Sequence, residues 1–526
     1  MNTVLLIQVA GIILLSMLLQ RMSRKFGAPY LLVVLILGLF LGNYGIVQLG
    51  YIGYSLAQQV CETALIFIMF YGGFDTRWVY ARKVLGPSTL LASVGVVSTC
   101  ALVALFCHYV IHWNWAESML LGAVVSSTDA ASVFAILKEK KLNLSGNITP
   151  LIEVESGSND PMSHMLTLIV ISVIKGGRGG GSAILLFISE TGIGIVTGVL
   201  IAILARIVLR NLSIRESLIS LFFFAVAILA FAIPDALGGN GYLSVYLVGL
   251  LLGQESFRGK KAIVHFFEGL TGLMEMLLFF ILGALAHPAA FPKVILPALA
   301  IFFFLLLVAR PLVVNSLLLP FQTFTAKHRA MVSLAGIRGA AAIVFAVIAL
   351  NQARPENDIL NIVFCIVLLS MGIQGGLLSV VAKWLGIVES SSQPQSFNDC
   401  VDDELQFGRI SITESSGWCG KTVQQTKLPE GLTIAVIVRD GQPVIPQSDT
   451  VLQAGDSVIT LTEPFEEAEI KVKQKVVKAD SRRVGRPMKD FPGSSTILLL
   501  KRDDENIIPS PETVLQAGDL LYILEV

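Results

Sequence analysis

One acid-bearing stretch, Pro150-Leu-Ile-Glu-Val-Glu-Ser-Gly-Ser-Asn-Asp-Pro161, interrupts a chain that is largely apolar up to about residue 390. Its Asp160 stands just before a hydrophobic run from Met162 to Ile174. Ionisable side chains at membrane depth are costly, so a carboxylate here predicts a site for ions or protons; the alternative is a helix-end carboxylate in water. Asp129, within the apolar run Leu120-Leu-Gly-Ala-Val-Val-Ser-Ser-Thr-Asp-Ala-Ala-Ser-Val-Phe134, favours the ion site. Two carboxylates in neighbouring hydrophobic segments predict a shared pocket.

The composition indicates a protein with many membrane spans. Of its 526 residues, 54% are hydrophobic and 14% are charged, and the mean hydropathy is +0.74. These values exclude an ordinary soluble protein. The six cysteines lack the spacing of metal or disulfide sites. The formal net charge of zero argues against nucleic acid as a partner. The lipid bilayer is therefore the expected surrounding.

Thirteen apolar runs are long enough to cross about 30 Å of hydrocarbon. They lie near residues 3–20, 28–46, 57–74, 85–112, 116–137, 152–174, 184–208, 216–234, 241–254, 265–286, 293–318, 330–350 and 359–387. The first lacks a basic region before it, so we expect a membrane span and not a cleaved signal peptide. The sequence thus predicts an α-helical polytopic fold of about 13 transmembrane helices.

Basic residues gather in the loops after odd-numbered spans. They are Arg21, Arg24, Lys25, Arg77, Arg82, Lys83, Lys138, Lys140, Lys141, Arg206, Arg210, Arg215, Arg258, Lys260, Lys261, Lys327 and Arg329. The positive-inside rule places these loops in the cytoplasm. We expect a multi-pass protein of the cell (inner or plasma) membrane, with its N-terminus outside and its C-terminal tail cytoplasmic.

Two of the predicted spans contain polar or glycine-rich interruptions. The fifth holds Ser126-Ser-Thr-Asp129, whose short side chains can bond to the backbone of an unwound helix. The twelfth holds Ala335-Gly-Ile-Arg-Gly-Ala-Ala341. Interrupted helices expose carbonyls and helix ends, from which transporters build cation sites, and matched interruptions indicate inverted repeats. Close helix packing is the alternative explanation for Gly336 and Gly339.

Helical geometry sorts the groups around Asp160. Ser156, four residues upstream, lies about 40° away around the axis and can share its face, whereas Glu155 lies about 140° away. A buried Glu155 needs a positive partner. Arg338, in the interruption of the twelfth span, is the partner we predict, in a structural lock.

An oxygen-rich pocket would suit a hard monovalent cation. The expected ligands are Asp160, Asp129, Ser156 and Thr128, with carbonyls freed by the broken helix. A cation and a proton competing for one carboxylate form an exchange mechanism by themselves. Asn159 adds no charge beside Asp160 and so predicts one cation against one proton, although helix-end capping is its alternative role.

The remaining ionisable groups in the spans have simpler explanations. His164 is better explained as a packed or hydrogen-bonded helix residue than as a cation ligand, given the preference for oxygen. Glu62, Glu190 and Glu275 lie in apolar surroundings. Snorkelling or interhelical hydrogen bonds suffice for them, and the sequence assigns them no role.

Together these residues resemble the monovalent cation:proton antiporter superfamily, in particular its NhaP-like electroneutral branch. The motifs that carry the resemblance are Ser127-Thr-Asp-Ala130, Glu155-Ser-Gly-Ser-Asn-Asp-Pro161 and Gly336-Ile-Arg-Gly339, in matching order across residues 1–390. The resemblance implies a homodimer whose protomers each have a dimerisation domain and a core domain that moves like an elevator. It also implies crossing discontinuous helices and exchange of cytosolic Na+ or K+ for H+.

The resemblance also implies roles for single residues. Asp160, Asp129, Ser156 and the Thr128 backbone would bind the cation. Asn159, Glu155 and Arg338, with the glycines Gly336 and Gly339, would hold the crossing helices. The chain departs from many relatives in one place, since Tyr71 stands where they carry an acid before Gly72-Gly73.

The polar tail contains an internal repeat. Residues 428–456 recur at a constant offset of 63, so that Arg439-Asp440 matches Arg502-Asp503. Each copy alternates apolar and polar residues between turns, which predicts small β-rich modules in an α+β tail. The copies resemble the TrkA-C-like subdomain of regulators of potassium conductance. We expect a transmembrane domain at 1–390, a TrkA-C-like domain at 398–470 and a second, diverged copy at 475–526.

These observations together predict a secondary active transporter and not an enzyme. We expect exchange of cytoplasmic K+ (or Na+) for H+, one for one, under control of the tail. No resident cofactor is expected; cyclic di-AMP or another nucleotide is the candidate effector, against a purely structural dimerisation cap. The alternatives are a Na+(Li+)/H+ antiporter of the same fold, a ligand-gated cation channel, and a sensor that transports nothing. A channel needs a carbonyl filter or charged ring, and no Thr-Val-Gly-Tyr-Gly-like loop occurs in the sequence.

Overall fold

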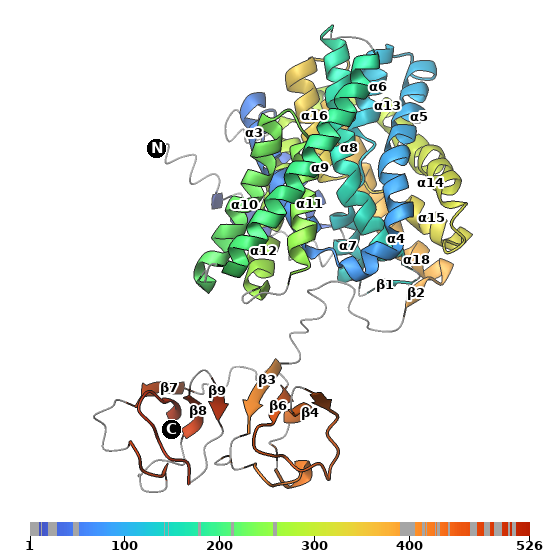
Figure 1. Ribbon diagram of the computed structural model, residues 1–526. Helices are drawn as coiled ribbons and strands as arrows, with labels where there is room; N and C mark the ends of the chain where they lie inside the picture. Colours follow the sequence, from blue (N-terminus) through green and yellow to red (C-terminus); the bar gives the residue numbers. More distant parts are fainter. Residues whose placement is uncertain are drawn as a thin grey trace. The chain divides into compact units, whose positions relative to one another are not determined.

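The computed structural model divides the chain into two compact units, residues 1–397 and 398–526. Figure 1 shows a helical unit followed by a unit of β-strands. The structure describes residues 10–11, 13–18, 29–45, 52–140, 142–145, 147–176, 180–211, 215–255, 260–389, 406–412, 416, 418–426, 428, 432–439, 442–462, 471–477, 484–488, 497–502, 505–507 and 512–525. The two units are treated separately below.

The first unit is built almost wholly of α-helices. Their bounds are Tyr30–Leu41 (α2), Tyr54–Asp75 (α3), Trp78–Leu90 (α4), Val96–Tyr109 (α5), Trp115–Val124 (α6), Ala130–Glu139 (α7), Ile148–Ile174 (α8), Gly180–Asn211 (α9), Glu216–Ala236 (α10), Gly241–Gly253 (α11), Lys260–Leu285 (α12), Phe291–Phe304 (α13), Arg310–Leu318 (α14), Ala326–Leu334 (α15), Ala340–Ala353 (α16), Ile359–Leu369 (α17) and Gly375–Leu385 (α18). In the described part of this unit, three π-helical turns join neighbouring helices into longer ones: Leu91–Gly95 (η1), Leu305–Ala309 (η3) and Ser370–Gln374 (η4).

Every predicted span after the first coincides with helical structure. Within the described residues, six helices are long and apolar enough to cross a membrane, among them Trp78–Tyr109 and Ile359–Leu385. The helices α2, α11 and α16 are apolar but shorter. The first predicted span, 3–20, lies mostly outside the described residues. The helical polytopic fold is therefore confirmed, while the number thirteen remains a prediction.

Both predicted helix breaks are present. Helix α6 ends at Val124 and α7 begins at Ala130, whereas α15 ends at Leu334 and α16 begins at Ala340. Each predicted span is thus two half-helices separated by five residues, 125–129 and 335–339. The unpaired ends of four half-helices therefore lie inside the helical unit.

Helix α8 continues unbroken through its proline. It has 27 residues, and Pro161 stands near its middle. Asp160 and Asn159 are consequently far from either end of the helix, which removes helix-end explanations for both. Asp160 is only 9% exposed and Asn159 1% exposed.

Close backbone contact joins α3 and α11 in the interior. A Cβ atom added at Gly249 of α11 would overlap the carbonyl oxygen of Phe70, and one added at Gly73 of α3 would overlap that of Tyr246. Glycine is required here because the two backbones touch. This contact holds α11 against α3.

The described residues of the second unit form two four-stranded antiparallel sheets. One has the order β3-β6-β4-β5, with strands Gln406–Ser411 (β3), Leu432–Arg439 (β4), Gln442–Val444 (β5) and Ser457–Thr462 (β6). The other has the order β7-β10-β8-β9, with strands Lys471–Val476 (β7), Ile497–Arg502 (β8), Glu505–Ile507 (β9) and Leu520–Glu525 (β10). Strands β4, β5 and β6 match β8, β9 and β10 at the offset of 63 found in the sequence.

The repeat extends to an ion pair between an arginine and a buried aspartate in each module. Arg439 donates two hydrogen bonds of 2.8 Å to Asp456, and Arg502 donates the same two to Asp519. Burial raises the pKa of Asp456, but the hydrogen bonds from Arg439 and from the Gln453 N–H outweigh it and hold the pKa below its usual range. The pair therefore stabilises the folded module above the ordinary aspartate pKa and loses this contribution as the pH falls.

We expect Gly249→Ala to destabilise the helical unit. The new methyl group would press on the Phe70 carbonyl, and overpacking of this kind costs about 1–3 kcal/mol. Thermal unfolding in detergent measures the effect as a lower Tm. Gly269→Ala is the matched control, because nothing lies within 4 Å of a Cβ atom there. Equal Tm values for the two variants would contradict the close contact between α3 and α11.

Candidate functional site

The two helix breaks meet each other. The backbone N–H of Asp129 donates to the carbonyl oxygen of Ile337 at 2.8 Å. A Cβ atom at Gly339 would overlap the Asp129 carboxylate, so Gly339 allows the approach of this side chain and does not serve helix packing. The crossing of discontinuous helices predicted from the sequence is thereby confirmed.

Asp129 lies between the positive ends of two half-helices. It stands immediately before α7 and accepts hydrogen bonds from the Ser132 hydroxyl at 2.6 Å and the Ser132 N–H at 3.2 Å. The first residue of α16, Ala340, also contributes its backbone N–H to the environment of Asp129. A carboxylate at a helix N-terminus offsets the partial positive charge of the helix dipole. Here one carboxylate serves two helices.

Arg338 lies at the negative end of α6. Its guanidinium donates to the carbonyl of Ser126 at 2.7 Å and also to that of Ser127. The arginine is 3% exposed, and its backbone N–H is held by the Ser370 hydroxyl at 3.0 Å. A cation at a helix C-terminus has the favourable sign, so Arg338 mirrors the role of Asp129.

The carbonyls at the broken ends have further partners. Ala123 accepts hydrogen bonds from the hydroxyls of Ser126 at 2.7 Å and Ser163 at 2.5 Å. The carbonyl of Leu334, at the end of α15, accepts from the Gln374 side chain at 2.6 Å. These bonds satisfy backbone groups that would be costly to bury alone.

Asp160 faces the break between α6 and α7. One of its carboxylate oxygens accepts a hydrogen bond from the Ser127 hydroxyl. Its carboxylate also interacts electrostatically with that of Asp129. The structure therefore brings together the two acids that the sequence singled out.

Ser156 and Asn159 connect α8 to the same break. The Ser156 hydroxyl donates to the Thr128 carbonyl at 2.8 Å and accepts from the Ala130 N–H at 2.9 Å. The Asn159 amide donates to the Thr128 hydroxyl at 2.6 Å. Ser156 thus shares the face of Asp160, as its spacing predicted, and Asn159 positions the break.

The donor set fits a hard monovalent cation. Around Asp160 it consists of carboxylate, hydroxyl and carbonyl oxygens, which such ions prefer. The described residues contain no cluster of three or more His, Cys, Asp or Glu side chains that could hold a transition metal. The arrangement can exchange one cation for one proton at Asp160, because either neutralises the carboxylate.

Glu155 pairs with an arginine that the sequence analysis passed over. Arg310, the first residue of α14, places its Nη2 atom 2.6 Å from Glu155 Oε1, and their side chains are 6% and 1% exposed. The predicted direct pair between Glu155 and Arg338 is wrong, because Arg338 is committed to the carbonyls at the end of α6. Glu155 does point away from Asp160, as predicted.

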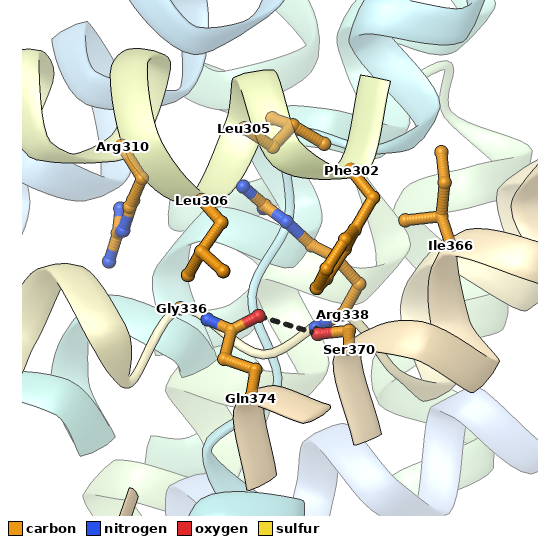
Figure 2. A pocket seen from close by; sticks show the side chains of 9 residues that line it. All are labelled: Phe302, Leu305, Leu306, Arg310, Gly336, Arg338, Ile366, Ser370 and Gln374. Atoms are coloured by element: carbon orange, nitrogen blue, oxygen red, sulfur yellow. Dashed lines mark hydrogen bonds between the residues drawn. The ribbon is translucent and has the colours of Figure 1, made fainter. Parts of the chain in front are cut away.

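Figure 2 shows Arg310 and Arg338 on one small pocket, beside the hydrogen bond between Ser370 and Gln374. Gly336 lines it too, and a Cβ atom there would lie 2.7 Å from Arg310 Nε. The volume of about 10 Å³ is about what one water molecule needs. Two guanidinium groups make this pocket unsuited to a cation.

Two family models match the chain. Residues 11–384 match the transmembrane domain of the sodium/hydrogen exchangers, and residues 407–471 and 474–524 each match the TrkA-C domain. The chain belongs to the sodium/hydrogen exchanger family.

Three relatives named as antiporters are similar to the chain over most of its length. The K+/H+ antiporter NhaP2 of Shewanella oneidensis is 34% identical over 85% of this chain and 79% of its own length. The K+/H+ antiporter NhaP of Alkalimonas amylolytica is 32% identical over 87% and 81%. The Na+/H+ antiporter ApNhaP of Aphanothece halophytica is 24% identical over 73% and 74%.

A solved structure shares the helical fold. The sodium proton antiporter MjNhaP1 from Methanocaldococcus jannaschii superposes with a TM-score of 0.62 at 22% identity. The match covers 72% of this chain and 97% of that one. The antiporter fold therefore accounts for the helical unit.

Several residues at the antiporter's site were missed by sequence reasoning. Arg310 follows the π-helical turn η3, and Ser370 and Gln374 open and close η4. Such turns re-aim side chains and often mark functional sites. Arg310-Pro311 within an apolar run was a sequence signal for one of them. Ser127 lay inside a quoted motif without a predicted role.

A double-mutant cycle tests the ion pair of Glu155. Removing Arg310 alone, as Arg310→Met, leaves a buried carboxylate unpaired, which costs about 3–5 kcal/mol. Combining it with Glu155→Gln should recover much of this loss, measured as Tm in detergent. The same cycle with Arg338→Met should show a smaller coupling energy. A coupling energy of Glu155 with Arg338 larger than that with Arg310 would contradict the ion pair seen here and support the pair predicted from the sequence.

Proposed function

We propose that this chain is a secondary antiporter that exchanges cytoplasmic K+ (or Na+) for H+ across the cell membrane. One observation carries the proposal: a carboxylate, Asp160, is buried in the middle of a membrane helix and faces two crossed helix breaks. A charge in this position is costly and marks ion or proton pathways.

The exchange follows from competition at one carboxylate. In the cation-loaded state, Asp160, the Ser156 hydroxyl and the Thr128 carbonyl supply oxygens to the ion, and Asp129 adds negative charge nearby. In the other state a proton occupies Asp160. Because Asn159 is neutral, the cycle carries one cation against one proton and is electroneutral. The Ser127 hydroxyl orients the carboxylate in this scheme.

The proposed roles of the remaining residues are structural. Glu155 and Arg310 join α8 to α14, while Arg338, Gly336 and Gly339 shape the crossing. We infer that residues 1–390 form the transporter and that 398–470 and 475–526 form two regulatory modules. The N-terminus lies outside and the tail in the cytoplasm. Two protomers associate, and the core domain of each moves like an elevator.

Potassium is the favoured cation. The relatives named as K+/H+ antiporters are 34% and 32% identical, whereas the one named as a Na+/H+ antiporter is 24% identical. The tail matches the TrkA-C domain. Its sequence resembles regulators of potassium conductance, which also favours potassium. A nucleotide such as cyclic di-AMP is the class of effector that we propose for these modules.

Asp160→Asn is expected to abolish exchange, because an amide cannot alternate between a cation and a proton. Proteoliposomes with a pH-sensitive dye inside report exchange as fluorescence dequenching after a K+ pulse. Glu268→Gln, an exposed acid on α12, is the control that should exchange normally. Unchanged Tm and oligomeric state would exclude misfolding. Normal exchange by Asp160→Asn would contradict the proposed site. Single-channel currents from the native chain in a bilayer would favour the alternative, a ligand-gated cation channel.

Removal of the tail tests regulation separately from transport. A chain truncated after residue 390 should keep the same order of rates across Li+, Na+, K+ and Rb+, because the proposed ligands all lie in the helical unit. Its rate at a fixed pH should differ from that of the full chain. A changed order of rates among the four cations would show that the tail determines selectivity. Equal rates for the truncated and full chains at every pH would contradict a regulatory role of the tail.

A further inference from the structure

Three acids lie in the first halves of α3 and α9 and at the end of α10. We call Glu62 of α3, Glu190 of α9 and Asp235 of α10 the acidic trio. Glu62 and Glu190 each interact electrostatically with Asp235. Glu62 and Glu190 are partly buried and Asp235 is exposed. Among the ion pairs formed by described residues, none involves the trio.

A buried tyrosine lies beneath the acidic trio. Tyr242, in the first turn of α11, is 1% exposed, and within the described part of the chain its hydroxyl has no hydrogen-bond partner. The hydroxyl interacts electrostatically with Glu62 and Asp235. A buried hydroxyl without a partner is costly, and such groups in native proteins usually bind water or an ion.

A histidine continues the polar track from Tyr242 toward the transport site. The ring of His164 lies 4.8 Å from that of Tyr242, edge to face. Its Nδ1 is likewise buried, with no partner among described residues. His164 follows Asp160 by four residues in α8, so it lies about 6 Å along the same helix face.

Asn240 fixes the spacing between these elements. Its backbone N–H donates to the Glu190 carbonyl at 2.9 Å, and its side chain donates to the Pro161 carbonyl at 3.1 Å. The start of α11 is therefore tied both to the acidic trio and to the residue that follows Asp160.

We propose that the acidic trio is the mouth of a monovalent-cation access route that passes Tyr242 and His164 to reach Asp160. The inference rests on the proposed antiport and deepens it. The trio raises the local concentration of cations, since a surface with an excess of one sign of charge attracts the opposite one. The Tyr242 hydroxyl oxygen then replaces part of the hydration shell during passage, and the His164 ring packs beside it.

The trio lies on one membrane face, at which α3 and α11 start. The positive-inside rule makes this the external face. Cations that the antiporter exports therefore leave by this route, and external cations enter by it when the exchange runs in reverse. The other tyrosine of α11, Tyr246, packs against Gly157, where a Cβ atom would overlap its ring. It lies one turn nearer the opposite face and serves as a matched control.

Tyr242→Phe removes one hydroxyl and keeps the packing. In vesicles of defined orientation, the apparent KM for K+ offered on the trio face should rise about tenfold, because the ion loses one oxygen ligand, an effect comparable with the loss of a hydrogen bond to a charged group. The KM for K+ offered on the opposite face should stay as in the native chain. Tyr246→Phe should leave the KM on the trio face unchanged. An unchanged KM for Tyr242→Phe would overturn the route.

Neutralising the three acids tests whether the acidic trio attracts cations to the access route. Glu62→Gln combined with Glu190→Gln and Asp235→Asn should lower kcat/KM on the trio face and abolish its dependence on ionic strength. Glu268→Gln is the control for loss of one exposed negative charge. A kcat/KM that keeps its ionic-strength dependence without the trio would contradict the assignment.

Chemical accessibility gives a readout besides activity. Tyr242→Cys should react with a membrane-impermeant thiosulfonate added to the trio face, and K+ should slow the reaction. Absence of labelling from the trio face would show a dry, packed position and overturn the route. Asp160→Asn is assayed in parallel: if it is inactive while the Tyr242 variants are normal, the antiport stands and only the route fails. If Asp160→Asn exchanges normally, the proposed function itself fails.

Discussion

Compensation of charge at the four broken helix ends is the constraint on which the site depends. Two N-termini converge on Asp129, while the end of α6 is covered by Arg338 and that of α15 by Gln374. Each group has the sign or the donor that its helix end requires. Without them, unpaired backbone groups would lie within the membrane, where each costs several kcal/mol. The crossing is therefore a rigid unit and not a flexible gap.

This rigid crossing gives Asp160 its chemistry. Helix α8 passes the break without interruption, so Asp160 is held against the polar groups of Ser127 and Thr128 at fixed separation. Glu155, on another face of α8, is fixed to Arg310 of α14. Helix α8 thus carries Glu155, which is paired with an arginine, and Asp160, which forms no ion pair among the described residues. In the proposed mechanism, it is Asp160 that alternates between a cation and a proton.

The sequence predicted those features that depend on local chemistry. The breaks at Ser126–Asp129 and Ala335–Gly339, the shared face of Ser156 and Asp160, and the tail repeat all follow from residue type and spacing. Ion pairs between distant helices could not be predicted from the sequence. Spacing shows that Glu155 points away from Asp160, but it does not show whether Glu155 pairs with Arg310 or with Arg338.

The sequence does not reveal in which direction side chains at irregular turns point, and this is why some residues of the site were not predicted. The π-helical turns η3 and η4 set the directions of Arg310, Ser370 and Gln374, and a π turn has no simple signature in one sequence. The geometry of the acidic trio was hidden for a similar reason. Its members lie on three separate helices, and only the tertiary packing brings them together.

The central claim is that one buried carboxylate holds either a cation or a proton. Isothermal titration of K+ into the purified protein, repeated in buffers of different ionisation enthalpy, counts the protons released on binding. The account predicts that one proton leaves for each K+ bound at a pH where Asp160 is protonated, and that Asp160→Asn releases none. Binding of K+ by the native chain without proton release would contradict it.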